Sequence, residues 1–315
     1  MGGIKGRVFA GFMAVISVTA LNIRASADDL YVAVQNATGI GAIDEISAGG
    51  VVKPFVSGLD NPSGLSFGPN GTLYVSLAPT RSTVVVDKVS PAGVVSPFSA
   101  SVPGDYLHGS AFDIAGNLFV GLDSFGLTRI SPDGFATPFA TADGQGVAFD
   151  SSGNLFSAAT VLNGVYKTSP AGVSQPVMSI DSPIGLAFDH LGNLFISSED
   201  DDTITELAPS GNSKAYASFA SSVSPFAPDA TVDLYGLAFD SHGTLYVAES
   251  DGTNGAIGIV TSGGTIQTYA TFPGVPIFIA DPSVSLVPEP VSLSLLALGG
   301  ITLLARRSRA TDKSN

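Results

Sequence analysis

Short apolar runs that alternate with tight polar turns recur along most of this chain. In the stretch 182–198, the apolar runs Gly185–Phe188 and Leu194–Ile196 flank the turn Asp189–Asn193. An aspartate at the start of such a turn accepts a hydrogen bond from the backbone two residues on, and Gly192 tolerates the positive φ that the turn needs. Because both faces of each run are apolar, the pattern predicts a β-hairpin that is covered on both sides.

Five copies of this hairpin are spaced like the blades of a propeller. Their equivalent turn glycines lie 45, 37, 39 and 51 residues apart, close to the ~40 residues of a four-stranded blade. A second hairpin, whose turn reads Ser-Pro-x-Gly or close to it, occurs six times. The turn glycines of the first hairpin are Gly71, Gly116, Gly153, Gly192 and Gly243.

The two ends of the repeat region each supply half of a missing first hairpin. Residues 29–33 match its second strand and residues 274–282 match its first strand. Pairing these halves closes the ring and removes open sheet edges. The sequence therefore predicts an all-β, six-bladed propeller over residues 28–286, closed by its N- and C-terminal strands. The predicted blades are 29–57 with 274–282, 61–100, 106–140, 143–178, 182–220 and 233–272.

The repeat Gly-Leu-Ala-Phe-Asp-x-x-Gly-Asn-Leu-Phe/Tyr-Val, clearest at 185–196 and 236–247, resembles NHL repeats and the SMP-30/gluconolactonase-like six-bladed propellers. The resemblance spans nearly the whole repeat region. It implies the fold and leaves the activity open, because this scaffold carries unrelated functions. It also implies a ligand site at the mouth of the central channel, where lactonase-like members hold a divalent cation with Asn, Asp and Glu side chains.

The matching mouth positions in this chain depart from that metal-binding set. They contain no carboxylate, whereas a hard cation needs several oxygen ligands. Among them, His108 is the catalytic candidate, as a general base if Asp105 or Asp123 lies within reach; the alternative is a polar side chain that lines the channel. The candidate ligand-face residues are Asn61, Ser63, His108, Gln145 and Tyr235, with Ile184 at an equivalent position and Pro276 nearby in the split blade.

The densest charge cluster is expected at the same mouth, because it follows a second strand. It consists of Glu199, Asp200, Asp201 and Asp202. A Ca²⁺ ion would relieve the repulsion among four carboxylates, but the alternating spacing and central glycine of an EF-hand loop are missing, which favours a solvated loop. The aspartates that begin the first turns are interpreted as turn caps: Asp113, Asp150, Asp189 and Asp240.

Composition limits the partners. The 315 residues include 13 basic and 27 acidic side chains and no cysteine, so neither a disulfide nor a thiolate metal site is available. Between residues 28 and 289 there are 6 basic and 26 acidic residues, a net charge of −20. A body this acidic repels nucleic acid and anionic lipid.

The N-terminal residues 1–27 read as a secretory signal peptide. Lys5 and Arg7 precede the apolar run 8–21, and Ala-Ser-Ala at 25–27 supplies a cleavage site for signal peptidase. The alternative, a first transmembrane helix, suits a longer run.

The C-terminal residues 287–310 resemble the PEP-CTERM sorting signal of Gram-negative bacteria. The motif Pro288-Glu289-Pro290 precedes the apolar run 291–305 and the basic pair Arg306 and Arg307. The resemblance implies cleavage by an exosortase-type membrane protease, with a transient inner-membrane anchor and release to the cell surface or extracellular matrix. The alternative is a simple tail anchor, although the run makes only ~22 Å of helix against a ~30 Å hydrocarbon core.

These signals favour an exported propeller that binds a polysaccharide or a matrix protein, or serves as a scaffold, without catalysis. The alternative is a secreted, lactonase-like hydrolase, either metal-dependent or metal-independent. Its atypical site would be centred on His108, Gln145, Tyr235 and the 199–202 loop. The longest connection between blades, 221–232, is interpreted as a recognition loop or an insertion.

Overall fold

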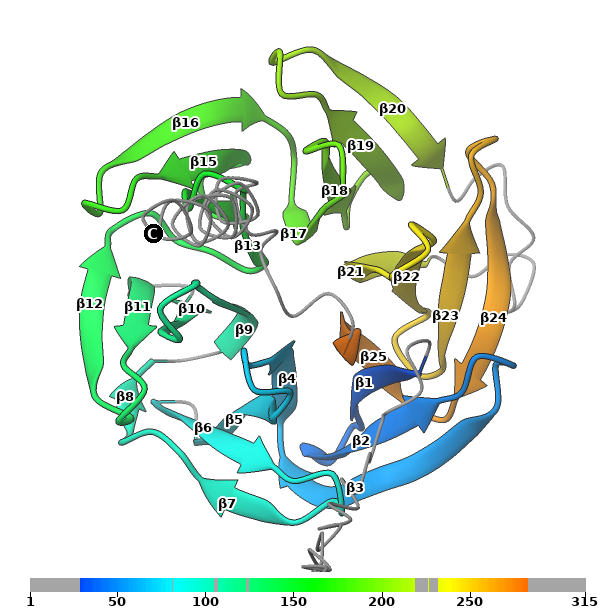
Figure 1. The fold of residues 1–315 in the computed structure, drawn as a ribbon. Helices are drawn as coiled ribbons and strands as arrows, with labels where there is room; N and C mark the ends of the chain where they lie inside the picture. The colour runs from blue at the N-terminus through cyan, green and yellow to red at the C-terminus, as the bar shows by residue number, and fades with distance from the viewer. Residues whose placement is uncertain are drawn as a thin grey trace, which may run out of the picture.

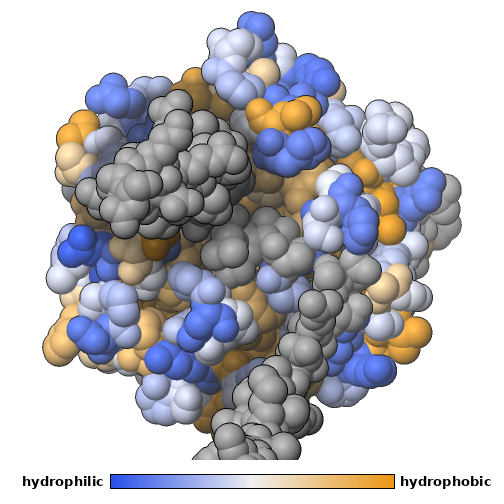
Figure 2. All heavy atoms as spheres, in the orientation of Figure 1, coloured by the Kyte–Doolittle hydropathy of each residue, from blue (hydrophilic) through white to orange (hydrophobic). Residues whose placement is uncertain are grey.

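The computed structural model describes residues 29–80, 82–104, 107–122, 125–218, 226 and 232–282. These residues form six sheets arranged around a central axis (Figure 1), so the prediction of an all-β, six-bladed propeller is confirmed. Figure 2 shows that hydrophilic residues cover much of the rim seen in that view, with apolar residues between them. No helix within the described ranges is long and apolar enough to cross a membrane.

Several sequence predictions fall elsewhere in the chain. The signal peptide at 1–27 and the sorting segment at 287–310 lie outside the described residues, as do Asp105, Asp123 and most of the loop 221–232.

In each blade the strands run antiparallel, from the innermost strand at the axis to the outermost strand at the rim. The first blade consists of β25 (Val275–Ala280), β1 (Leu30–Gln35), β2 (Ile40–Ile46) and β3 (Val52–Asp60). The second consists of β4 (Pro62–Phe67), β5 (Leu73–Thr80), β6 (Thr83–Val89) and β7 (Val95–Pro97), with β8 (Val102–Pro103) also paired to β6. The third consists of β9 (Leu107–Phe112), β10 (Leu118–Leu122), β11 (Gly126–Ile130) and β12 (Ala136–Ala140).

The remaining three blades repeat this arrangement. The fourth consists of β13 (Val147–Phe149), β14 (Leu155–Ala159), β15 (Gly164–Thr168) and β16 (Ser174–Ser179). The fifth consists of β17 (Pro183–Phe188), β18 (Leu194–Ser198), β19 (Thr203–Leu207) and β20 (Ser213–Ser218). The sixth consists of β21 (Asp233–Phe239), β22 (Leu245–Ser250), β23 (Gly255–Val260) and β24 (Ile266–Phe272).

The ring closes through the first blade, as the two half-hairpins predict. Strand β25 pairs antiparallel with β1, with Tyr31 opposite Ala280 and Val34 opposite Pro276. The last described strand thereby becomes the innermost strand of the first blade (Figure 1). This pairing covers the edge that β1 would otherwise expose.

Neighbouring inner strands meet at the axis with backbone against backbone. A Cβ placed on Gly64 would lie 2.1 Å from the carbonyl oxygen of His108, and one on Gly185 would lie 2.4 Å from that of Tyr235. Both distances are far below contact distance, so only glycine fits. Behind this ring, the second strands carry small residues at the equivalent buried position: Ala33, Ser76, Gly121, Ala158, Ser197 and Ala248.

One of these small residues links two blades by hydrogen bonds. The Ser197 Oγ accepts a bond from the Gly185 N–H (2.8 Å) and donates one to the Tyr235 carbonyl of the next blade (2.5 Å). The hydroxyl therefore satisfies two backbone groups where no side chain fits between the strands.

Farther from the axis, aromatic rings join each blade to the next. Phe119 packs edge to face on Phe139 of its own blade (4.8 Å between ring centroids) and on Phe149 of the next blade (5.2 Å). Edge-to-face pairs add stabilisation beyond the apolar area that they bury. Equivalent trios are Tyr31 with Phe55 and Phe67, Tyr74 with Phe98 and Phe112, and Phe195 with Tyr216 and Phe239.

The aspartates of the first turns are caps, as predicted. The Asp189 Oδ1 accepts hydrogen bonds from the N–H groups of Leu191 (2.9 Å) and Asn193 (2.8 Å). Gly192 has a φ of 84°, in the left-handed region that favours glycine. Equivalent bonds are made by Asp113, Asp150 and Asp240.

We expect the axis to tolerate no added methyl group. Gly64→Ala should destabilise the protein by roughly 1–3 kcal/mol, because the new Cβ would overlap the His108 carbonyl and one of the strands must move. Gly49→Ala is the matched control, since a Cβ on Gly49 would meet nothing within 4 Å. Thermal and urea unfolding of the two variants measure the difference, and equal stabilities would contradict backbone contact at the axis.

Candidate functional site

The inner strands all begin at one end of the axis, which we call the mouth. Pro183, the first residue of β17, pairs with Ser198, the last residue of β18. The start of an inner strand and the loop after the second strand therefore lie together, as predicted. In β25, Ile277 takes the position that directly precedes the inner-strand glycine in the other blades, and Pro276 lies one residue earlier. A Cβ on Gly236 would lie 2.7 Å from the Ile277 carbonyl oxygen, and the other inner-strand glycines face the residue at this position in the next blade in the same way.

The predicted ligand-face residues differ in how far they reach the surface. Ser63 is buried (4% exposed), whereas His108, Gln145 and Tyr235 are partly exposed. Asn61 has a structural role. Its φ is 42°, and its side-chain amide donates to the carbonyl of Ala78 (3.1 Å), which fixes the connection between the first two blades.

The acidic cluster 199–202 lies at the mouth and is held by the chain beside it. The Glu199 N–H donates to the Ser182 carbonyl (3.1 Å), and the Ser182 hydroxyl donates to the Asp200 carboxylate. Burial raises the pKa of Glu199, and the nearby charges of Asp233 and Asp200 raise it further. The pKa of Asp202 is raised by burial and by neighbouring carboxylates in the same way.

The structure adds Asp233, which sequence reasoning missed, to this cluster. It begins β21 in the next blade, and its Oδ2 accepts a hydrogen bond from the Tyr235 hydroxyl (3.4 Å). Burial raises the pKa of Tyr235, as do the charges of Asp233 and Glu199. The only local signal was a carboxylate directly before the sequence of an inner strand. We call Glu199, Asp200, Asp202, Asp233 and Tyr235 the acidic mouth cluster.

His108 interacts electrostatically with this cluster from the third blade. It lowers the pKa of Glu199, although the effect is smaller than that of burial and the pKa remains raised. Side chains of the third and fifth blades therefore influence one another at the mouth. Carboxylates, a phenol and an imidazole at one opening can accept hydrogen bonds from hydroxyl groups and attract cationic groups.

The described residues do not provide the ligand set that a calcium ion at the 199–202 loop would need. Within the described parts of the chain, no three His, Asp or Glu side chains are grouped so that they could hold a metal ion. Besides burial, the charges of Asp200 and Asp201 raise the pKa of Asp202, and both of these aspartates are exposed to solvent.

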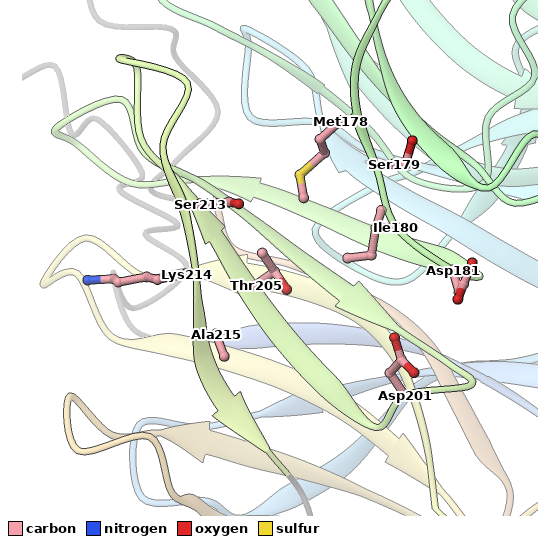
Figure 3. Close-up of a pocket in the computed structure, with 9 residues that line it drawn as sticks. All are labelled: Met178, Ser179, Ile180, Asp181, Asp201, Thr205, Ser213, Lys214 and Ala215. Carbon is pink, nitrogen blue, oxygen red and sulfur yellow. The ribbon is translucent and has the colours of Figure 1, made fainter.

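A groove of about 540 Å³ between the fourth and fifth blades was also missed by sequence reasoning (Figure 3). Val177 occupies the outer-strand position that is aromatic in the other five blades. A Cβ on Gly211, in the facing turn of the fifth blade, would meet nothing within 4 Å, whereas equivalent turn glycines press on the preceding blade. The groove is lined by Met178, Ser179, Ile180, Asp181, Asp201, Thr205, Ser213, Lys214 and Ala215.

Comparisons with known proteins define the fold class. The sequence matches no protein-family profile and no curated protein. Among solved structures, a streptogramin B lyase is 15% identical with a TM-score of 0.54, covering 80% of this chain and 86% of that one. A catalytically inactive histidine-to-alanine variant of virginiamycin B lyase from Staphylococcus aureus, with quinupristin, is 14% identical (TM-score 0.53; coverage 78% and 86%). A gluconolactonase-like protein is 16% identical (TM-score 0.53; coverage 69% and 80%). These likenesses establish a shared propeller fold.

Glu249 is a buried carboxyl group that sequence reasoning did not single out. It is 1% exposed, and its Oε1 has no hydrogen-bond partner. Gly258 provides its space, since a Cβ there would lie 1.9 Å from that oxygen. Burial raises the pKa of Glu249 to about 8. The available signal was a charged residue where equivalent strands carry Leu77, Leu122 or Ala159.

We expect Glu249 to make stability fall as pH rises. The folded state binds its proton more tightly than the unfolded state, so the stabilisation is complete below the ordinary pKa of 4.5 and is lost as pH rises through about 8. The Glu249→Gln side chain cannot ionise, so this variant should not lose that stability as pH rises. Its free energy of unfolding, compared with that of the unmodified protein at the same pH, should therefore rise by on the order of a few kcal/mol between pH 4.5 and about 8. Urea unfolding at several pH values measures this difference. Asp133→Asn, at an exposed turn residue, is the control and should follow the unmodified protein. If stability depends on pH in the same way for Glu249→Gln and the unmodified protein, Glu249 is not a buried ionisable group.

Proposed function

We propose that the protein is an exported binding module whose mouth takes an extracellular polysaccharide. The observation that supports this most directly is the acidic mouth cluster, in which two blades place Glu199, Asp233 and Tyr235 together. Carboxylates accept hydrogen bonds from sugar hydroxyls, and an aromatic ring offers an apolar face to a sugar ring. A matrix protein with basic side chains is the other class of ligand that this charge would attract.

The proposed location rests on the sequence of the two ends. The signal at 1–27 supports export through signal peptidase, and the motif at 287–310 supports processing by an exosortase-type protease. In this proposal the apolar run 291–305 holds the protein at the inner membrane of a Gram-negative bacterium before release to the cell surface or matrix. An acidic body suits such a location, because it stays soluble and repels anionic polymers.

Binding at the mouth is testable with purified full-length chain in a mild detergent. A glycan array should reveal bound polysaccharides, and titration calorimetry with each should show at least about tenfold weaker binding for Asp233→Asn, which removes a charged hydrogen-bond acceptor. Asp133→Asn makes the same charge change in an exposed turn at the other end of the ring and should bind normally. Equal affinities for the two variants would place the ligand elsewhere, and no glycan binding at all would contradict the proposal.

A second candidate function, a hydrolase or lyase, is favoured by one observation. His108 and Glu199 lie close enough for the imidazole to lower the pKa of the carboxyl group, and such a pair can transfer a proton to or from a bound substrate. The similar fold of the streptogramin and virginiamycin B lyases, one of which is inactive when a histidine is replaced, suggests quinupristin as a substrate to test alongside lactones.

If this second function is correct, the chain should consume one of these substrates, and His108→Ala should lower kcat/KM by on the order of 100-fold or more. Gln145→Ala changes another partly exposed mouth residue without removing an acid or base, and should retain most of the activity. Chromatographic assays of lactones and quinupristin measure both variants. Turnover that survives His108→Ala would exclude this histidine as the base.

A further inference from the structure

The two ends of the ring differ in chemistry, and the described part of the propeller chain begins at residue 29 and ends at residue 282, both at the end opposite the mouth. Strand β1 begins at this end, where Tyr31 pairs with Ala280 at the end of β25. The turns of both hairpins also lie there, because the inner strands run away from the mouth before they turn. We call this end, with its turns, the terminal face.

Hairpin tips on the terminal face expose large apolar side chains. Val51, Val94, Phe135 and Val173 each follow a turn glycine of the second hairpin and are 57%, 63%, 71% and 57% exposed. Ile114 and Leu191, in turns of the first hairpin, are 82% and 69% exposed. Single exposed apolar residues need no explanation, but six on the tips of one face suit contact with an apolar phase. The mouth end exposes Ile40, Phe125, Val161 and Leu162, so apolar residues alone do not distinguish the two ends.

The described cations all lie toward the terminal face, and the first-hairpin turns of the same face also carry the capping aspartates Asp113, Asp150, Asp189 and Asp240. Every lysine and arginine that the structure describes lies in the residue pair next to the last one before a second-hairpin turn, and therefore close to the terminal face. The pairs are Lys53 with Glu45, Lys88 with Ser96, Arg129 with Thr137, Lys167 with Gln175, and Lys214 with Glu206. One such cation lies in each of the first five blades. Among the described residues, the mouth end carries the acidic cluster and no lysine or arginine. Lys167 and Lys214 also pair with Asp150 (3.1 Å) and Glu206 (2.9 Å).

The chain that follows the propeller limits how far the terminal face can lie from a membrane. Only residues 283–290 separate Pro282, the last described residue, from the apolar run 291–305. Eight residues span at most about 29 Å when fully extended. The mouth lies farther from that exit, because a six-residue inner strand such as β17 adds about 20 Å. With the run embedded, the point where the chain leaves the terminal face therefore lies within about 29 Å of the bilayer.

We propose that the terminal face rests on a phospholipid surface while the apolar run 291–305 is embedded. This inference rests on the membrane anchor of the proposed function. Phe135 and the other apolar tips enter the headgroup region, while the exposed side chains of Lys53 and Arg129 behind them extend toward lipid phosphates. The acidic mouth cluster points away from the membrane, which reduces its repulsion from lipid phosphates and leaves the mouth open to ligand.

A single introduced tryptophan tests this orientation, because the chain has none of its own. Phe135→Trp places the probe on the terminal face, and Phe125→Trp places it at the mouth end, where Phe125 is 55% exposed. Each full-length variant is reconstituted into phosphatidylcholine vesicles, with and without lipids brominated near the headgroup. We expect the emission of Phe135→Trp to shift to the blue and to be quenched by the brominated lipid, while the emission of Phe125→Trp does neither.

Controls make every outcome informative. Both variants must unfold cooperatively like the unmodified chain in detergent, and vesicle flotation shows whether the chain is embedded. Quenching of Phe125→Trp alone, or equal quenching of both, overturns the proposed orientation. Flotation without quenching of either probe shows that the propeller stands clear of the bilayer, and failure to float removes the anchor; both overturn the proposal. Glycan binding by vesicle-bound chain is measured separately, so its loss would contradict the mouth function without affecting the quenching result.

Discussion

The ring depends on backbone contact between neighbouring inner strands at the axis. At Gly64 and Gly185 this contact leaves no room for a Cβ, and small residues such as Ser197 stand behind the strands. This contact brings the inner strands together around the axis. At the mouth, His108 of the third blade lowers the pKa of Glu199 of the fifth. The candidate site thus combines the 199–202 loop with residues that packing around the axis brings beside it.

Departures from the repeat are informative because the repeat is otherwise regular. Where Val177 replaces the outer aromatic residue, Phe156 keeps its contact with Phe188 of the next blade, and Lys167 lies over the Phe156 ring at 5.2 Å. The facing turn at Gly211 loses its contact with the preceding blade, and the groove between the fourth and fifth blades opens. The loss of one aromatic ring in the fourth blade therefore goes together with a lost contact in the facing turn of the fifth blade.

The two ends of the propeller support a division of tasks. The mouth gathers carboxylates around Tyr235, while the opposite end carries the described cations, the exposed apolar tips and the exit of the chain toward its apolar run. Such an arrangement suits a protein that is held at one end and binds at the other.

The sequence by itself determined the hairpins, the six blades, their closure and the capping aspartates such as Asp189. These features follow from apolar periodicity and turn chemistry, which act over a few residues and repeat. Tertiary structure alone decided that Asp233 joins Glu199 at the mouth, that Ile277 takes the position beside Pro276, and that Glu249 is buried against Gly258. Each depends on contact between segments of different strands or blades, and the distance between such segments is set by packing that no local pattern records.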